Sequence, residues 1–97
     1  MKRDALVIKE QDNVATALRD LASQETVTFG IGIESKQILV KEDIPYGHKF
    51  AVRDIKKGDD ILKYGEIMGR AILDIPAGSH AHIHNIESLR GRGDLSS

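Results

Sequence analysis

Cysteine is absent from the 97 residues of this chain, and so is tryptophan. Without cysteine the chain cannot form disulfides, use a thiolate nucleophile, bind an iron–sulfur cluster or build a cysteine zinc site. Any metal ion must therefore be bound by histidine, aspartate or glutamate. The sequence also has no glycine-rich phosphate loop, no G-x-S-x-G nucleophile elbow and no H-E-x-x-H zinc motif, so it contains none of these catalytic motifs.

Long hydrophobic runs and an excess of one charge are missing too. The longest unbroken apolar run is Ala5–Ile8, far too short for a membrane span or for the core of a signal peptide. The 14 Lys and Arg residues balance 15 Asp and Glu residues, for a net charge of -1, which gives no support to polyanion binding. We therefore predict a small cytoplasmic domain with no membrane and no nucleic-acid partner.

Hydrophobic periodicity predicts a mostly β fold with one helix. Val14, Leu18 and Leu21 are spaced as on one face of a helix. We therefore predict a helix over Asn13–Ala22, with Asp12 or the residue after it as its cap. Short β-branched or alternating segments predict the strands Ala5–Ile8, Glu25–Phe29, Gln37–Lys41, Lys49–Val52, Asp60–Lys63, Ile67–Leu73 and His80–His84.

A five-residue unit, D-I-x-x-G, occurs three times between residues 43 and 78. The copies are Asp43–Gly47, Asp54–Gly58 and Asp74–Gly78. Glycine adopts a positive φ at no steric cost, so each copy is predicted to reverse the chain while its isoleucine is anchored in the core. The units indicate a fold of short strands joined by tight turns.

Histidine is concentrated at two places. His48 follows the first turn unit, and His80, His82 and His84 alternate along the last predicted strand. Alternate residues of a strand face the same side about 7 Å apart, so neighbouring imidazoles could share a metal ion, with a further ligand from His48 or a partner chain. Neutral imidazole suits Fe²⁺, Mn²⁺ or Zn²⁺ and also transfers protons. Alternatively, the row lines an exposed strand edge, where polar side chains deter edge pairing, and His48 is a turn residue.

Two cationic side chains flank the strand that follows His48. Lys49 begins this strand and Arg53 comes directly after it, so either could bind the carboxylate of a small molecule. Most lysines and arginines at a protein surface are solvated and bind nothing, which is the alternative interpretation of both.

Three motifs, in this order, resemble those of a known family. They are I-P-Y-G-H-K-F-A at residues 44–51, I-L-K-Y-G-E-I-M-G at residues 61–69 and G-S-H-A-H-I-H-N at residues 78–85. They look like the N-terminal module of altronate dehydratase, are similar to the small subunit of sulfolactate sulfo-lyase, and more distantly resemble the N-terminal part of galactarate dehydratase. The G-H-K element occurs in all three relatives, whereas H-x-H-x-H-N is shared with the first two.

The resemblance implies a SAF-type β-clip domain, which we predict to span residues 1–86. Residues 87–97 contain glycines and terminal serines but few apolar residues, so we predict a flexible C-terminal tail there. The resemblance also implies a role beside a much larger catalytic part, which is fused in altronate dehydratase and separate in the sulfo-lyase. We therefore predict a small accessory subunit of a sugar-acid dehydratase, a carbon–oxygen lyase that is inactive without its large catalytic subunit. A homo-oligomer is also compatible with the sequence.

The family chemistry is an elimination from a hydroxy acid. A proton leaves the carbon next to a carboxylate, water or sulfite leaves the next carbon, and the resulting enol rearranges to a 2-keto acid. Such a reaction needs a base, an acid and a cation that stabilises the developing charge. The predicted site consists of catalytic His48 and His82, substrate-binding Lys49 and Arg53, and His80, His82 and His84 as ligands of a divalent metal, Fe²⁺ or Mn²⁺.

Three other functions are compatible with the same residues. The chain could be the small subunit of a sulfolactate sulfo-lyase. It could be a non-catalytic SAF module that binds carbohydrates or anions by itself. It could also be a structural domain that promotes oligomerisation, in which case the histidines are incidental.

Overall fold

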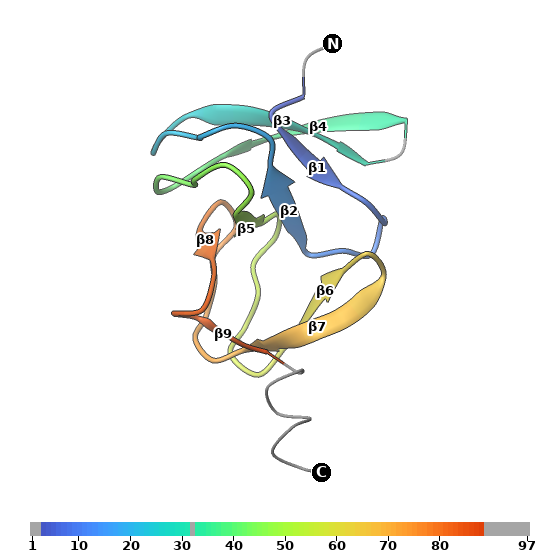
Figure 1. Ribbon diagram of the computed structural model, residues 1–97, viewed down its shortest axis with the longest axis vertical. Helices are drawn as coiled ribbons and strands as arrows, with labels where there is room; N and C mark the ends of the chain where they lie inside the picture. The colour runs from blue at the N-terminus through green and yellow to red at the C-terminus, as the bar shows by residue number, and fades with distance from the viewer. Residues whose placement is uncertain (1–2, 32, 89–97) are drawn as a thin grey trace.

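The computed structural model describes residues 3–31 and 33–88 as two β-sheets (Figure 1). The larger sheet has six strands in the order β4-β3-β1-β2-β5-β8, and the smaller has three in the order β6-β7-β9. Strand β1 pairs with β3 in parallel, and the other neighbours pair antiparallel. The strands are β1 Ala5–Val7, β2 Val14–Ala17, β3 Thr26–Ile31, β4 Glu34–Leu39, β5 Lys49–Ala51, β6 Asp60–Lys63, β7 Glu66–Ala71, β8 His80–Ala81 and β9 Ile86–Ser88.

Two hydrophobic clusters stabilise the fold, and β2 and β5 contribute to both. Phe50 and Ala15 belong to the cluster of the larger sheet, whereas Ala51 and Val14 belong to the second cluster. Successive side chains of a strand point to opposite faces, so one strand can supply neighbouring residues to two cores. Strands β2 and β5 therefore lie in the middle of the molecule, buried on both faces.

The predicted helix over Asn13–Ala22 is wrong, because the described residues contain no helix and this segment forms β2 and the turn after it. The spacing of apolar residues is misleading here. A strand that is buried on both faces needs no alternation of apolar and polar residues, so its sequence does not show the two-residue period of a half-buried strand. Leu18, a member of the predicted helical face, is 45% exposed. The mostly β part of the prediction is consistent with the structure, and no helix that could cross a membrane occurs in the described ranges.

Asp12, predicted as a helix cap, instead fixes the turn between β6 and β7. Its side chain is 1% exposed. One carboxylate oxygen accepts the backbone N–H of Tyr64 at 2.9 Å, and the other accepts that of Gly65 at 2.8 Å. Both turn residues have a positive φ, +59° and +74°. The next residue, Asn13, accepts the N–H of Leu62 at 2.8 Å, so the loop before β2 ties the two sheets together.

All three D-I-x-x-G units form the predicted turns, with buried isoleucines and glycines at φ +83°, +94° and +88°. A fourth turn of the same kind, Asp20–Gln24, was not predicted, because leucine replaces isoleucine and glutamine replaces glycine. Gln24 nevertheless has a φ of +70°. The four turns form two pairs through the bridges Leu21↔Ile44 and Ile55↔Ile75.

The aspartates of each turn pair act reciprocally. Asp20 accepts the N–H of Tyr46 in the partner turn, and Asp43 accepts that of Ser23 in return. Asp54 and Asp74 exchange the same contacts with Ala77 and Lys57. The aspartate of each turn therefore caps the opposite turn of its pair. The turn Asp43–Gly47 leads directly into His48, and the turn Asp74–Gly78 leads into His80.

Strand β9 includes residues 87 and 88, the first two of the predicted tail. The rest of that predicted tail, residues 89–97, lies outside the described residues, so its predicted flexibility stays a prediction.

Candidate functional site

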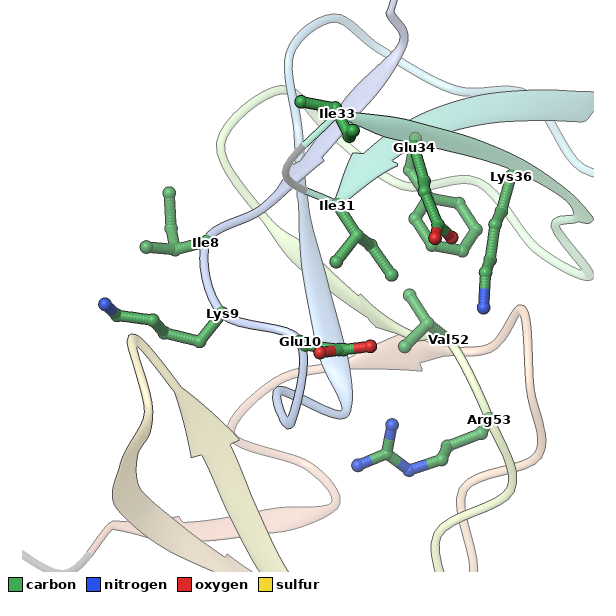
Figure 2. A pocket seen from close by; sticks show the side chains of 10 residues that line it. Ile8, Lys9, Glu10, Ile31, Ile33, Glu34, Lys36, Val52 and Arg53 are labelled. Carbon is green, nitrogen blue, oxygen red and sulfur yellow. The ribbon is translucent and has the colours of Figure 1, made fainter.

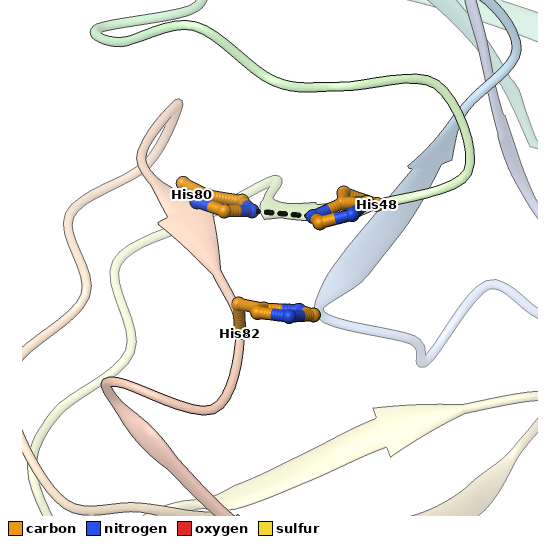
Figure 3. A group of neighbouring side chains, drawn as sticks. All are labelled: His48, His80 and His82. Atoms are coloured by element: carbon orange, nitrogen blue, oxygen red, sulfur yellow. Dashed lines mark hydrogen bonds between the residues drawn. The ribbon is translucent and has the colours of Figure 1, made fainter.

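The pairing of β5 with β8 brings His48 to the histidines near residue 80. Lys49 lies opposite Ala81, and Phe50 opposite His80, in antiparallel register. One step further along this register, His48 faces His82. Residues that face each other across a strand pair have side chains in contact range. Figure 3 shows the three imidazoles of His48, His80 and His82 gathered between these two chain segments, and we call them the histidine cluster.

Hydrogen bonding and stacking connect the histidine cluster. His48 Nδ1 lies 3.0 Å from His80 Nε2, which requires one nitrogen to donate a proton and the other to accept it. The rings of His48 and His82 stack with centroids 4.4 Å apart, and those of His80 and His82 with centroids 5.4 Å apart. The bond therefore links these two rings directly, and the stacking places the third ring, His82, against both of them.

The predicted strand His80–His84 is shorter than expected. Strand β8 ends at Ala81, and a turn follows in which Asn85 N–H donates to the His82 carbonyl oxygen. The Asn85 side chain accepts the His82 N–H at 2.9 Å and donates to the His80 carbonyl oxygen at 2.8 Å. The asparagine of the H-x-H-x-H-N motif is therefore a positioning residue, and no site role was predicted for it from the sequence.

His84 is exposed and contacts the histidine cluster only at its edge, through the ring of His80. Its ring centroid lies 5.4 Å from that of His80, tilted by 40°. The ligand nitrogens of His48, His80 and His82 lie within 4.8 Å of one another. The predicted metal ligand His84 is thus not part of this group, whereas His48, predicted as an acid–base residue, is.

Burial and neighbouring charges favour the neutral form of two imidazoles. Partial burial lowers the pKa of His80, positive charge on the neighbouring imidazoles lowers it further, and the Glu42 carboxylate acts in the opposite direction. For His82, burial also lowers the pKa, followed by the charges on His48 and Lys49. A neutral imidazole can accept a proton or bind a metal ion. Both functions are therefore available near neutral pH.

These lowered pKa values predict that the metal-free chain loses stability in mild acid. The unfolded chain binds more protons than the folded chain once the pH falls below about 6.5, the ordinary histidine pKa, so acid favours unfolding. We expect the urea midpoint to fall between about pH 7.5 and pH 5.5. The double variant with His80→Gln and His82→Gln should show a smaller fall of the urea midpoint. The single variant His84→Gln should show nearly the same fall as the unchanged chain. Equal pH dependence in all three proteins would contradict the burial of these imidazoles.

The histidine cluster fits a divalent metal in its donor set but not in its present ring orientation. Nitrogens bound to one ion about 2.1 Å away lie about 3.0 to 3.4 Å apart, a spacing the group can reach. A ring nitrogen binds through a lone pair in the plane of the ring, and the His48 and His80 nitrogens point at each other. These two rings would have to turn for an ion to replace the shared proton.

Lys49 lies beside the histidine cluster, but Arg53 does not line the same pocket. Lys49 lines a pocket of about 240 Å³ together with His82 and Lys63. Burial lowers the pKa of Lys49, and the Lys63 ammonium lowers it further. No site role for Lys63 is predicted from the sequence, because only the fold brings the end of β6 to the pocket that Lys49 lines.

Arg53 lines a different pocket, of about 410 Å³, where Figure 2 shows its guanidinium below Glu10 and Val52. It donates to the carbonyl oxygens of Gln11 at 2.8 Å and Asp12 at 3.1 Å. These bonds give Arg53 a structural partner at the loop before β2. Its predicted contact with a substrate stays a prediction.

Comparison with known proteins gives a consistent result over nearly the whole described chain. A family model described as the altronate/galactarate dehydratase SAF domain matches residues 3–89. Altronate dehydratase of Bacillus subtilis (strain 168) is 45% identical over 82 residues, 84% of this chain and 16% of that protein. Altronate dehydratase of Escherichia coli (strain K12) is 45% identical over 74 residues, 76% of this chain and 14% of that protein.

A shorter relative matches over most of its own length. (2R)-Sulfolactate sulfo-lyase subunit alpha of Paracoccus pantotrophus is 41% identical over 54 residues, 56% of this chain and 81% of that protein. Its name says that it is one subunit of a larger enzyme. The chain thus corresponds to a small part of the dehydratases and to most of this subunit.

Proposed function

The chain belongs to the family of altronate/galactarate dehydratase SAF domains, and on that premise we propose that it completes the active site of a lyase whose larger catalytic part lies on another chain. The observation that carries this proposal is the histidine cluster, with three ring nitrogens within 4.8 Å of one another. The names of its relatives support the reaction class, and the name "subunit alpha" supports the division between two chains.

Within this proposal the histidine cluster moves protons. His82 is favoured in its neutral form by burial, which lowers its pKa, so it can accept the weakly acidic proton next to a substrate carboxylate. His48 shares a hydrogen bond with His80, so a proton can pass between these two rings, and His48 also stacks on the ring of His82. The reaction proposed is loss of water from a sugar acid, which gives a 2-keto-3-deoxy acid.

Binding of a divalent metal is an alternative role for the same three rings, with His48, His80 and His82 as its ligands after ring rotation. Such an ion, Fe²⁺ or Mn²⁺, would polarise the substrate's oxygen atoms and stabilise negative charge. The Asn85 side chain holds the backbone of His80 and His82 in place for either role. Removal of the ion should leave the fold intact, because the two cores do not include these rings.

A second candidate substrate class is supported by a relative that this chain matches over most of that protein's length. The sulfo-lyase subunit alpha of Paracoccus pantotrophus is matched over 81% of its length, against 16% for the Bacillus subtilis dehydratase. Sulfite would then replace water as the leaving group, with the same base next to the carboxylate. The two reactions differ in the atoms that leave, so one assay separates them.

Affinity capture from the native cells, followed by activity assays, tests the proposal. The chain should co-purify at a fixed ratio with a large chain, and the complex should form a 2-keto acid from altronate or galactarate, or release sulfite from sulfolactate. Neither chain should do so alone. Recovery of this chain by itself, or of a complex without elimination activity on these acids, would contradict the proposal.

A further inference from the structure

A small pocket beside the histidine cluster has the composition of an anion site. It has a volume of about 240 Å³ and combines two lysines and a histidine with apolar side chains. Its lining residues are Lys49, Ile61, Lys63, Met68, His82, Ile83, Ile86 and Ser88. None of these described residues carries a carboxylate, so no acidic side chain within the lining offsets the two ammonium groups.

We propose that this pocket binds the acid group of an organic-acid substrate, with the carboxylate between the ammonium groups of Lys49 and Lys63. The inference rests on the function proposed above, and it assigns a role to Lys63, a residue of the second motif (residues 61–69) for which the motif itself suggested no role. The ligand class is a small hydroxy acid with one carboxylate at the end that enters the pocket.

The arrangement of charge favours such an anion. Lys49 comes from the start of β5 and Lys63 from the end of β6, and two like charges lining one pocket repel each other. A carboxylate between them replaces this repulsion with two charge-assisted hydrogen bonds. The Lys63 ammonium also lies 4.9 Å from the centre of the Tyr64 ring, a cation–π contact that limits the motion of the lysine side chain.

The position of His82 in the same pocket links binding to chemistry. The proton to be removed sits on the carbon next to the carboxylate, so a base must lie close to the acid subsite. His82 lines the pocket together with both lysines. The apolar side chains of Ile61 and Met68 exclude water from part of the pocket, which strengthens the contacts of the acid group.

The first test uses steady-state kinetics of the complex with substitutions in this chain. Lys63→Gln should raise KM for the acid substrate about tenfold or more, because one charged hydrogen bond is lost, while kcat changes less. Lys63→Arg should restore part of the affinity. The matched control is Lys57→Gln, an exposed lysine on a turn outside the pocket lining, which should behave as the unchanged protein.

The second test uses the full chain alone, so that its outcome does not depend on the lyase activity. In an NMR titration, sodium altronate should shift the amide signals of Lys49, Lys63 and His82, and the neutral alcohol altritol should not. Shifts with both compounds, or no shift at the two lysines, would overturn the subsite. Loss of activity in His48→Ala with an unchanged KM in Lys63→Gln would also overturn it while leaving the proposed function in place.

Discussion

Replacement of His48 with alanine should lower the elimination rate of the complex by about two orders of magnitude or more. Positioned acid–base groups typically contribute this much to proton-transfer steps. The substitution removes the ring that stacks on His82 at 4.4 Å and the hydrogen bond at 3.0 Å to His80. The measurement is kcat of the purified complex with saturating acid substrate, with the circular dichroism spectrum as a check on folding.

His84→Ala is the matched control for this prediction. His84 belongs to the same motif, but it is exposed and lies outside the group of three ring nitrogens. Its replacement should change kcat less than about threefold, a small fraction of the acid–base effect. If His84→Ala were as damaging as His48→Ala, the functional cluster would have to include the whole histidine row, as the sequence predicted.

Gly78→Ala should destabilise the fold by about 3 kcal/mol or more, because strain and a clash act together at this position. Gly78 has a φ of +88°, a region that alanine rarely adopts, and an added Cβ would lie too close to the Leu39 carbonyl oxygen. The neighbouring backbone cannot give way cheaply, since Gly78 donates to Ala51 and accepts from Lys41. Urea unfolding gives the free energy of unfolding for both proteins.

Gly58→Ala separates the clash from the backbone strain. Gly58 occupies the same place in the paired turn, with a φ of +94°, and an added Cβ would meet no atom within 4 Å. Its replacement should therefore cost about 1 kcal/mol, the strain of a left-handed alanine alone. Equal losses in the two variants would show that the close approach to Leu39 contributes nothing.

The turns and many strands of the fold could be predicted from local sequence, because the determinants are local. Each D-I-x-x-G unit supplies its own buried isoleucine and its own glycine at positive φ. The segment Asn13–Ala22 was not predictable in this way, since its strand is buried on both faces by elements far away in the sequence. The reciprocal aspartates of the turn pairs also became apparent from the structure, because they contact turns about 20 residues away.

The candidate site was predicted in part. The motifs pointed to the family, and the comparison confirms that resemblance. They also pointed to the histidines that the fold brings together but not to their grouping, since periodicity alone places His84 with His82 and leaves His48 apart. The pairing of β5 with β8 decides the grouping, and this register depends on the whole sheet. Lys63 reaches the site in the same way, through the packing of β6.

The most direct test of a shared active site is a titration of the large chain with this chain, followed by the initial rate of 2-keto acid formation or sulfite release. The rate should be near zero without this chain, rise in proportion to it and level off at a fixed stoichiometry. A chain with His48, His80 and His82 all replaced by Ala should bind with the same stoichiometry and restore no activity. Full activity of the large chain alone, or full activity with the triple variant, would contradict the account.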